Sequence, residues 1–261
     1  MNSNPSASEP ASSLSAPGLH SSQRPAEPQY GSSARVLVID DEPEIWRAVR
    51  AGLTGAGFIA EWAPTGAEGI ELVARWHPDV VILDLTLPDL DGIEVCRQLR
   101  QWSQVPIIVL SVRGGDADKV MALELGADDY LTKPFSMAEL TVRVRVALRH
   151  AAHMSGSSDK EARFQTGALV MDFERRQVSV DGREIHLTPI EYDLMKYLAI
   201  NAGRVLTHRA ILRAVWGPAY EQEIHYLRVF FNQLRRKIEP DPSRPRYLLT
   251  ELGIGYRLRA D

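Results

Sequence analysis

The stretch VVILDLTLPDLDG, Val80–Gly92, decides the fold. Its first four residues are aliphatic and lack the polar alternation of a half-exposed strand, which indicates a parallel strand covered by helices on both faces. Asp84 follows at the carboxyl end of this strand, the edge of an open α/β sheet where ligands bind. An aspartate that only opens the next turn is the alternative, because Asp is a common turn residue.

Short aliphatic runs alternate with amphipathic stretches on both sides of this strand. The runs are RVLVI (35–39), FIAEW (58–62), PDVVILD (78–84), VPIIVLS (105–111) and DDYLTK (128–133). Helical patterns lie near residues 43–56, 66–76, 92–101, 116–125 and 136–150. These five β/α units predict a doubly wound, five-stranded parallel sheet of the α/β class over residues 34–150.

The ends and junctions of the chain differ in composition from this pattern. Residues 1–33 are rich in Ser, Pro and Ala and contain no apolar core of a signal peptide, so we expect a disordered tail. Residues 151–163 predict a flexible linker before a second domain at 164–261. No apolar run approaches the ~20 residues that cross a bilayer. The single cysteine, Cys96, fits a reducing cytoplasm, so we expect a cytoplasmic protein without membrane partners.

Charge separates the two halves, although the whole chain carries a net charge of −4. Residues 34–150 contain 18 acidic and 12 basic residues, whereas residues 164–261 contain 12 acidic and 15 basic residues. The first half is therefore a poor candidate for binding nucleic acid, and the second half is a better one.

Polar residues follow the predicted strands at the edge that carries Asp84. Asp40 and Asp41 follow the first strand, and carboxylates this close together favour a hard divalent cation such as Mg²⁺. Ser111 and Lys133 follow the fourth and fifth strands. A hydroxyl and an ammonium are the donors that a transferring phosphoryl group requires, and a carboxylate can accept that group as an aspartyl phosphate.

The second half predicts an α+β domain. VDGRE carries the Asp-Gly signal of a β-hairpin, and Thr207 is a plausible N-cap for the second of three helices. The last helix, His225–Glu239, has an apolar stripe of Leu227, Phe231, Leu234 and Ile238 with basic residues elsewhere on its surface. The stretch RYLLTELGIGYRL then predicts a hairpin around Gly253 and Gly255, which suggests a winged helix.

The first half resembles the receiver domain of two-component response regulators. The resemblance rests on the acidic pair, Asp84, the hydroxyl and the Lys-Pro pair, each after its own strand. It implies Asp84 as phosphoacceptor, Asp40, Asp41 and the Thr86 carbonyl as further Mg²⁺ ligands, Ser111 and Lys133 as phosphate-binding residues and Tyr130 as a switch residue. It also implies a sensor histidine kinase as partner and slow loss of the phosphoryl group, without enzymatic turnover.

The second half resembles the winged-helix effector of the OmpR/PhoB family, through LT-x-x-E-x-x-L, VW, LR-x-K and G-x-GYR in the family order. It implies a recognition helix in the major groove of promoter DNA, with RNA polymerase as a candidate partner. The expected DNA-binding residues are His225, Tyr226, Arg228, Asn232, Gln233, Arg235, Arg236, Lys237 and Arg257. HYLRVFFNQLRRKIEPDPSRPRYL further resembles family members that control potassium-transport operons.

Charged residues around the predicted fifth strand suggest a homodimer that forms on phosphorylation. In the family this face forms the active dimer, and opposite charges can pair across a two-fold axis. The expected pairs are Lys119–Glu139, Glu124–Arg145 and Asp128 or Asp129 with Arg143. An ordinary charged surface is the alternative, because exposed ion pairs are common.

Two other classes of protein are alternatives to a DNA-binding response regulator. An Mg²⁺-dependent phosphatase or hydrolase shares the aspartate chemistry, but it normally needs an acid shortly after the nucleophile, and Thr86 occupies the second position after Asp84. A stand-alone receiver or interaction module does not explain the basic second half.

Overall fold

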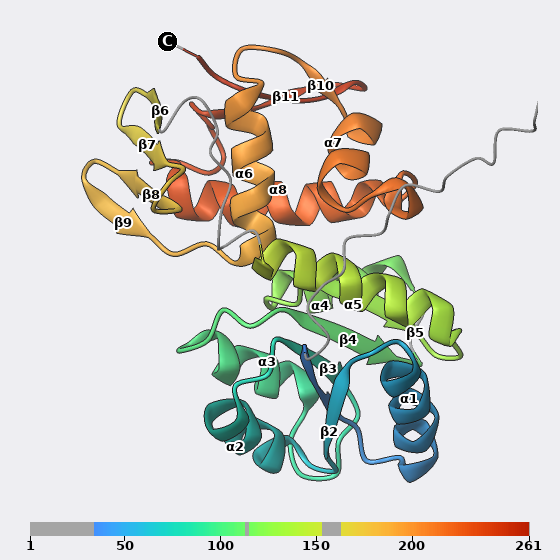
Figure 1. Ribbon diagram of the computed structural model, residues 1–261. Coiled ribbons are helices and arrows are strands. Elements are labelled where there is room, and N and C mark those ends of the chain that lie inside the picture. Colours follow the sequence, from blue (N-terminus) through green and yellow to red (C-terminus); the bar gives the residue numbers. More distant parts are fainter. Residues whose placement is uncertain (1–33, 113–114, 153–162, 261) are drawn as a thin grey trace, which may run out of the picture. The chain divides into compact units, whose positions relative to one another are not determined.

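The strand at Val80–Asp84 is the centre of a five-stranded parallel sheet. The computed structural model describes residues 34–112, 115–152 and 163–260, and its first sheet has the order β2-β1-β3-β4-β5 (Figure 1). The strands are β1 (Arg35–Ile39), β2 (Ile59–Ala63), β3 (Val80–Asp84), β4 (Ile107–Ser111) and β5 (Asp129–Thr132). The helices are α1 (Pro43–Gly55), α2 (Gly66–Trp76), α3 (Gly92–Arg100), α4 (Asp116–Glu124) and α5 (Met137–Ala152). The predicted α/β class is confirmed.

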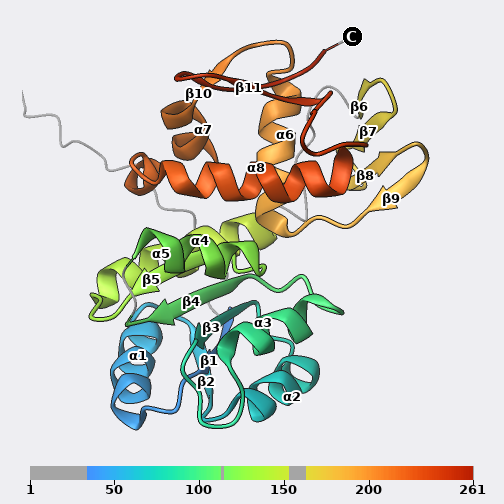
Figure 2. The ribbon, with the colours of Figure 1, turned by 180° about the vertical axis from the view of Figure 1, so that it is seen from behind.

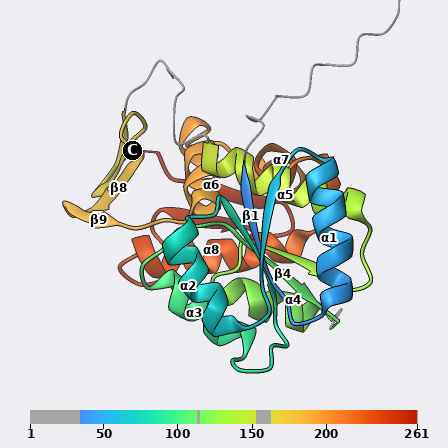
Figure 3. The same cartoon turned by 60° about the horizontal axis from the view of Figure 1, so that its bottom comes forward.

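Helices cover both faces of this sheet. Val80 and Ile82 pack with Val49 of α1 and Val144 of α5 on one face. The strand side chains that point to the opposite face of the sheet pack against α2, α3 and α4. Figure 3 shows α2 and α3 across the sheet from α1. Residues 80–83 are therefore fully buried, which explains why the sequence of this strand is continuously aliphatic.

The three aspartates of the opening stretch have different roles. Asp89 accepts hydrogen bonds from the backbone N–H groups of Gly66 and Ala67 at the start of α2. Asp91 is the N-cap of α3 and accepts from the N–H of Ile93. Turn and cap formation therefore explains these two residues, whereas Asp84 ends β3 and is buried.

The C-terminal half has the expected α+β architecture. A four-stranded antiparallel sheet precedes three helices and a three-stranded sheet of order β10-β12-β11. The strands are β6 (Arg163–Thr166), β7 (Leu169–Asp172), β8 (Gln177–Val180), β9 (Arg183–Ile185), β10 (Leu206–Thr207), β11 (Leu248–Glu251) and β12 (Gly255–Leu258). The helices are α6 (Pro189–Ile200), α7 (His208–Val215), the 3₁₀ turn η2 (Pro218–Tyr220) and α8 (Ile224–Ile238). Figure 2 shows α8 running across α6 and α7.

Local sequence signals explain the ends of these elements. Asp181 and Gly182 both have positive φ, as a tight two-residue hairpin turn requires. Thr207 is the N-cap of α7, as predicted. The two-residue strand β10 was not expected from the sequence, and it pairs with β12 so closely that a Cβ on Gly255 would lie 1.9 Å from the carbonyl oxygen of Leu206. Glycine is therefore required where the wing crosses β10.

Several expectations concern segments that the structure describes only in part. The predicted tail, residues 1–33, and most of the predicted linker, residues 153–162, lie outside the described residues. Within the described ranges, none of the helices is long and apolar enough to cross a membrane. The described residues belong to one compact unit, in which α8 packs against α4 and α5 packs against α6.

Candidate phosphoacceptor site and recognition helix

Asp84 is held at the carboxyl end of the central strand. Its Oδ1 accepts a hydrogen bond from the N–H of Thr86 at 2.9 Å, and only 5% of the residue is exposed. The chain then returns at Gly92, where a Cβ would lie 2.3 Å from the carbonyl oxygen of Asp84. Glycine is therefore necessary for this close return, which fixes the backbone around the candidate phosphoacceptor.

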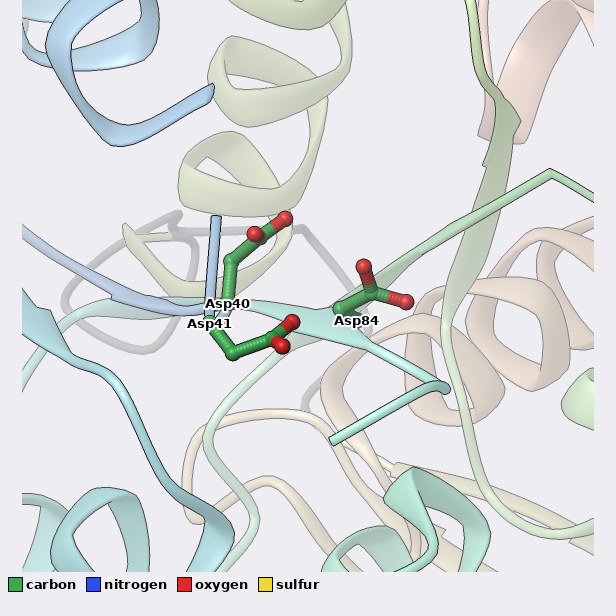
Figure 4. Close-up of side chains that lie close together, drawn as sticks. All are labelled: Asp40, Asp41 and Asp84. Carbon is green, nitrogen blue, oxygen red and sulfur yellow. The ribbon is translucent and has the colours of Figure 1, made fainter. Parts of the chain in front are cut away.

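The acidic pair lies beside Asp84, because β1 and β3 are parallel neighbours with Ile39 in register with Leu83. Asp40 is fully buried and Asp41 is exposed. Each of the three aspartates offers a carboxylate oxygen within 4.8 Å of the others (Figure 4). The strand order thus brings Asp84 next to the acidic pair, from which it is separated by 43 to 44 positions in the sequence.

Lys133 reaches into this cluster from the end of β5. Its Nζ lies 2.5 Å from Oδ2 of Asp84, 2.9 Å from Oδ2 of Asp40 and 2.9 Å from Oε1 of Glu42. The backbone N–H of Lys133 donates to the carbonyl oxygen of Ser111, the last residue of β4, which is itself buried. The site therefore contains the hydroxyl, the ammonium and the carboxylates that the sequence predicted for phosphoryl chemistry.

Burial and hydrogen bonding act in opposite directions on the charges of this site. Burial raises the pKa of Asp40, and the hydrogen bond from Lys133 partly offsets the increase. Burial disfavours the charged form of Lys133, but hydrogen bonds to Asp84, Asp40 and Glu42 outweigh it and raise its pKa. Lys133 therefore remains a cation among four carboxylates, an excess of negative charge that suits a hard divalent cation with oxygen ligands.

The exposed face of α8 presents some of the residues that were expected to bind DNA. Arg228, Asn232, Arg236 and Lys237 are exposed on this helix. Lys237 also pairs with Glu191, and two other predicted residues contact neighbouring parts of the chain: Arg235 donates to the Leu248 carbonyl oxygen and Arg257 pairs with Glu251. His225 lies near Glu223 at the start of α8.

Two further residues of α8 contact the parallel-sheet domain, residues 34–150 (hereafter the sheet domain). Tyr226 is buried, and its hydroxyl donates to Oδ1 of Asp129 at 2.5 Å. Gln233 donates to the carbonyl oxygen of Leu123 on α4 at 2.6 Å. The helix α8 is thus partly covered by the α4 and β5 region of the same chain.

Asp129 is the centre of this contact. It also accepts a hydrogen bond from the hydroxyl of Tyr220 and pairs with Arg143 at 2.7 Å, and the Arg143 guanidinium lies 5.0 Å from the Tyr220 ring centroid. Burial is the main cause that raises the pKa of Tyr220 and of Tyr226, and the negative charge of Asp129 is the second. Both hydroxyls therefore stay protonated and donate. Sequence reasoning missed Tyr220, because nothing in the local pattern marks it.

Several of the charged residues expected at a dimer interface form contacts within the chain. Asp128 is buried and pairs with Arg100 at 2.6 Å, so only Asp129 of the two candidate acids lies next to Arg143. Glu139 pairs with Arg143 of the same chain at 2.9 Å. Lys119 and Glu124 lie on α4 and Arg145 on α5. Tyr130, the expected switch residue, is 2% exposed, and its backbone N–H donates to Tyr226.

A parallel-sheet domain with this acidic site, followed by a winged helix, defines a response regulator with a DNA-binding effector. A family model described as response regulator receiver domain matches residues 36–145, and one described as transcriptional regulatory protein, C terminal, matches residues 182–258. The chain belongs to the OmpR/PhoB type of response regulators.

The relatives agree with this assignment over most of the chain. The transcriptional regulatory protein KdpE of Mycobacterium tuberculosis H37Rv is 49% identical over 225 residues, which cover 86% of this chain and 99% of that protein. The KDP operon transcriptional regulatory protein KdpE of Escherichia coli K12 is 48% identical over 223 residues, 85% of this chain and 97% of that protein.

Among solved structures, a mutant of RitR has a TM-score of 0.70 with 21% identity, covering 87% of this chain and all of that one, and therefore supports the fold. The hydrolase alternative is not favoured, because the matched families and relatives are transcription regulators and not turnover enzymes.

Proposed function

We propose that this chain binds promoter DNA when Asp84 has accepted a phosphoryl group. The observation that carries the proposal is the position of Asp84 at the end of β3, within 2.5 Å of Lys133 and beside Asp40 and Asp41. An Asp84 carboxylate oxygen forms a bond to phosphorus as the bond from phosphorus to the donor breaks, and the donor leaves with the bonding electron pair. Lys133 and Ser111 then bind phosphoryl oxygens.

The residues present fit an Mg²⁺ ion. Asp40, Asp41, Asp84 and the backbone carbonyl of Thr86 would hold it, because carboxylate and carbonyl oxygens are its preferred protein ligands. When bound, the ion supplies positive charge that offsets the carboxylates and the phosphoryl oxygens. The phosphoryl donor in the cell is a sensor histidine kinase, the chain acts in the cytoplasm, and the phosphoryl group is lost slowly without turnover.

We further propose that the chain controls a potassium-transport operon. The support is the high identity to regulators named KdpE, one of which is named for the KDP operon, over nearly their whole length. Footprinting on the upstream region of the potassium-transport operon in the chain's own genome tests this. Protection by the phosphorylated chain is expected, and protection confined to unrelated promoters would contradict the operon assignment.

DNA contacts are assigned to the exposed face of α8. Arg236→Ala should weaken binding to all sequences and reduce the slope of log affinity against log salt by ~0.9, because one phosphate contact no longer releases a counterion. Asn232→Ala should change sequence preference, because an amide can read adenine. Titrations at several salt concentrations with the operator and a scrambled duplex separate the two effects. If neither variant differs from the wild-type chain, α8 is not the DNA reader.

Phosphorylation should also promote a homodimer through the α4, β5 and α5 face. We propose that Lys119–Glu139, Glu124–Arg145 and Asp129–Arg143 pair between subunits, with Asp129 and Glu139 exchanging their present contacts to Arg143 for contacts across the two-fold axis. Two recognition helices would then bind one DNA site, and RNA polymerase is a candidate partner of that complex.

Charge reversal tests this interface. Glu139→Lys should prevent dimer formation by the beryllofluoride-activated chain, because it places like charges opposite each other, and adding Lys119→Glu should restore the dimer. Sedimentation velocity measures both. A Glu139→Lys chain that dimerises as well as the wild type would place the interface elsewhere.

The unphosphorylated chain is proposed to rest with α8 docked on the sheet domain. Tyr226 and Gln233 are engaged with Asp129 and Leu123 in this arrangement, so both are withheld from DNA. The proposed dimer uses the same α4 and β5 surface. Undocking of α8 and dimerisation would therefore be favoured together, which couples phosphorylation at Asp84 to DNA binding.

A further inference from the structure

Glu42 is a half-exposed carboxylate at the edge of the phosphoacceptor site that no role assigned above requires. It is the N-cap residue of α1, and its side chain makes no capping hydrogen bond. Instead Oε1 of Glu42 lies 2.9 Å from Nζ of Lys133, and the Glu42 side chain is 54% exposed. The start of α1 therefore has no side-chain cap, because the Glu42 carboxylate pairs with the buried Lys133.

The hydrogen-bonding capacity of Lys133 is already filled in this structure. An ammonium group has three N–H donors and no acceptor. Its three carboxylate partners here are Asp40, Asp84 and Glu42. A phosphoryl oxygen on Asp84 can therefore bind Lys133 only when one of these partners leaves.

Exposure decides which partner leaves at the lowest cost. The Asp40 and Asp84 side chains are 0% and 7% exposed, so either would lose its main cation inside the protein. Glu42 can turn into solvent and be hydrated, because it is the most exposed of the three. Its charge also repels an incoming phosphoryl donor, which is itself an anion.

We propose that Glu42 is a positioning residue that competes with the phosphoryl group for Lys133. In the resting chain it holds the ammonium beside the acidic cluster, and it releases the ammonium when Asp84 is modified. Glu42 thereby sets how readily the modified state forms, without touching the phosphorus atom. The inference rests on the proposed role of Asp84 as phosphoacceptor.

The full-length Glu42→Gln variant tests this role, since it removes the charge and keeps the size of the side chain. Glu44→Gln is the matched control: the same change in the first turn of α1, at a side chain that is 75% exposed and pairs with Arg47. Affinity for beryllofluoride at saturating Mg²⁺ is the main readout, and Mg²⁺ affinity is measured separately without beryllofluoride. Tryptophan fluorescence can follow both, because the Trp62 indole N–H donates to the Asp40 carbonyl oxygen at 2.8 Å.

Glu42→Gln should bind beryllofluoride roughly two- to fivefold more tightly than the wild type, the range that a partly exposed ion pair supports. It should also be labelled faster by a small acyl phosphate, and Glu44→Gln should match the wild type in both. Equal or weaker beryllofluoride binding by Glu42→Gln overturns the proposal, as does an effect confined to Mg²⁺ affinity. If the wild-type chain binds beryllofluoride and the Glu42→Gln and Glu44→Gln variants behave alike, the proposed role of Glu42 is wrong. The proposed role of Asp84 is then not affected. Labelling that survives loss of the Asp84 carboxylate would instead contradict the proposed function.

Discussion

Asp84→Asn should reduce labelling by a small phosphoryl donor in Mg²⁺ to background. The substitution keeps the shape of the side chain but replaces the nucleophilic carboxylate oxygen by a neutral amide. Asp40 and Asp41 remain, so any labelling of a second acid would be visible. The gain in intact-protein mass, reversed by hydroxylamine as expected for an acyl phosphate, measures the effect.

Asp91→Asn is the control for this experiment. Asp91 lies in the same loop and allows the same change from aspartate to asparagine. Its side chain caps α3, and asparagine is about as good an N-cap residue as aspartate. Asp91→Asn should therefore be labelled like the wild type. Asp84→Asn should keep a melting temperature close to that of the wild type, because it removes one of three carboxylates paired with one lysine. Wild-type labelling of a folded Asp84→Asn chain would show that another residue is the phosphoacceptor.

Tyr226→Phe should raise the DNA affinity of the unphosphorylated chain by roughly tenfold or more. It deletes the hydroxyl that donates to the buried carboxylate of Asp129 across the α8 contact. A hydrogen bond to a charged group contributes ~1.5–3 kcal/mol, which is about ten- to 150-fold in the docking equilibrium. The gain in DNA affinity cannot exceed the value reached when α8 is fully undocked. The affinity of the activated wild-type chain therefore sets the upper limit. Fluorescence anisotropy with an operator duplex measures both forms.

Tyr220→Phe separates undocking from a direct DNA effect, because Tyr226 lies on α8, the proposed recognition helix, and Tyr220 does not. Tyr220 donates to the same carboxylate, so its loss should also raise the affinity of the unphosphorylated chain. After activation with beryllofluoride, the Tyr220→Phe and wild-type chains should bind DNA alike. If Tyr220→Phe leaves the unphosphorylated affinity unchanged, the contact at Asp129 does not restrain α8.

The sequence alone determined the architecture of the sheet domain and the place of its acidic site. The aliphatic run 80–83 is buried on both faces because helices cover the sheet, and this covering follows from the β/α alternation along the chain. Asp40 and Asp84 meet because parallel strands end at a common edge. The hairpin turn at Asp181 and the N-cap at Thr207 could also be predicted from the sequence, because a turn or a cap depends on a few adjacent residues.

Only the tertiary structure decided which residues of α8 are accessible. The apolar stripe through Leu227 and Phe231 was correctly predicted, but Tyr226 is buried as well, because α8 is covered by the sheet domain in addition to its own core. Side-chain periodicity reports one buried face of a helix and does not identify a second partner surface.

The partners of the charged residues were likewise decided by contacts between distant parts of the chain. Asp129 meets Tyr226 across 97 residues, and Gln233 meets Leu123 across 110. Asp128 and Asp129 are adjacent and chemically identical in the sequence, yet Asp128 turns to Arg100 and Asp129 to Arg143, since successive positions at a strand point to opposite faces of the sheet. The local sequence supplies the charges, and the packing of helices on the two faces determines which cation each acid meets.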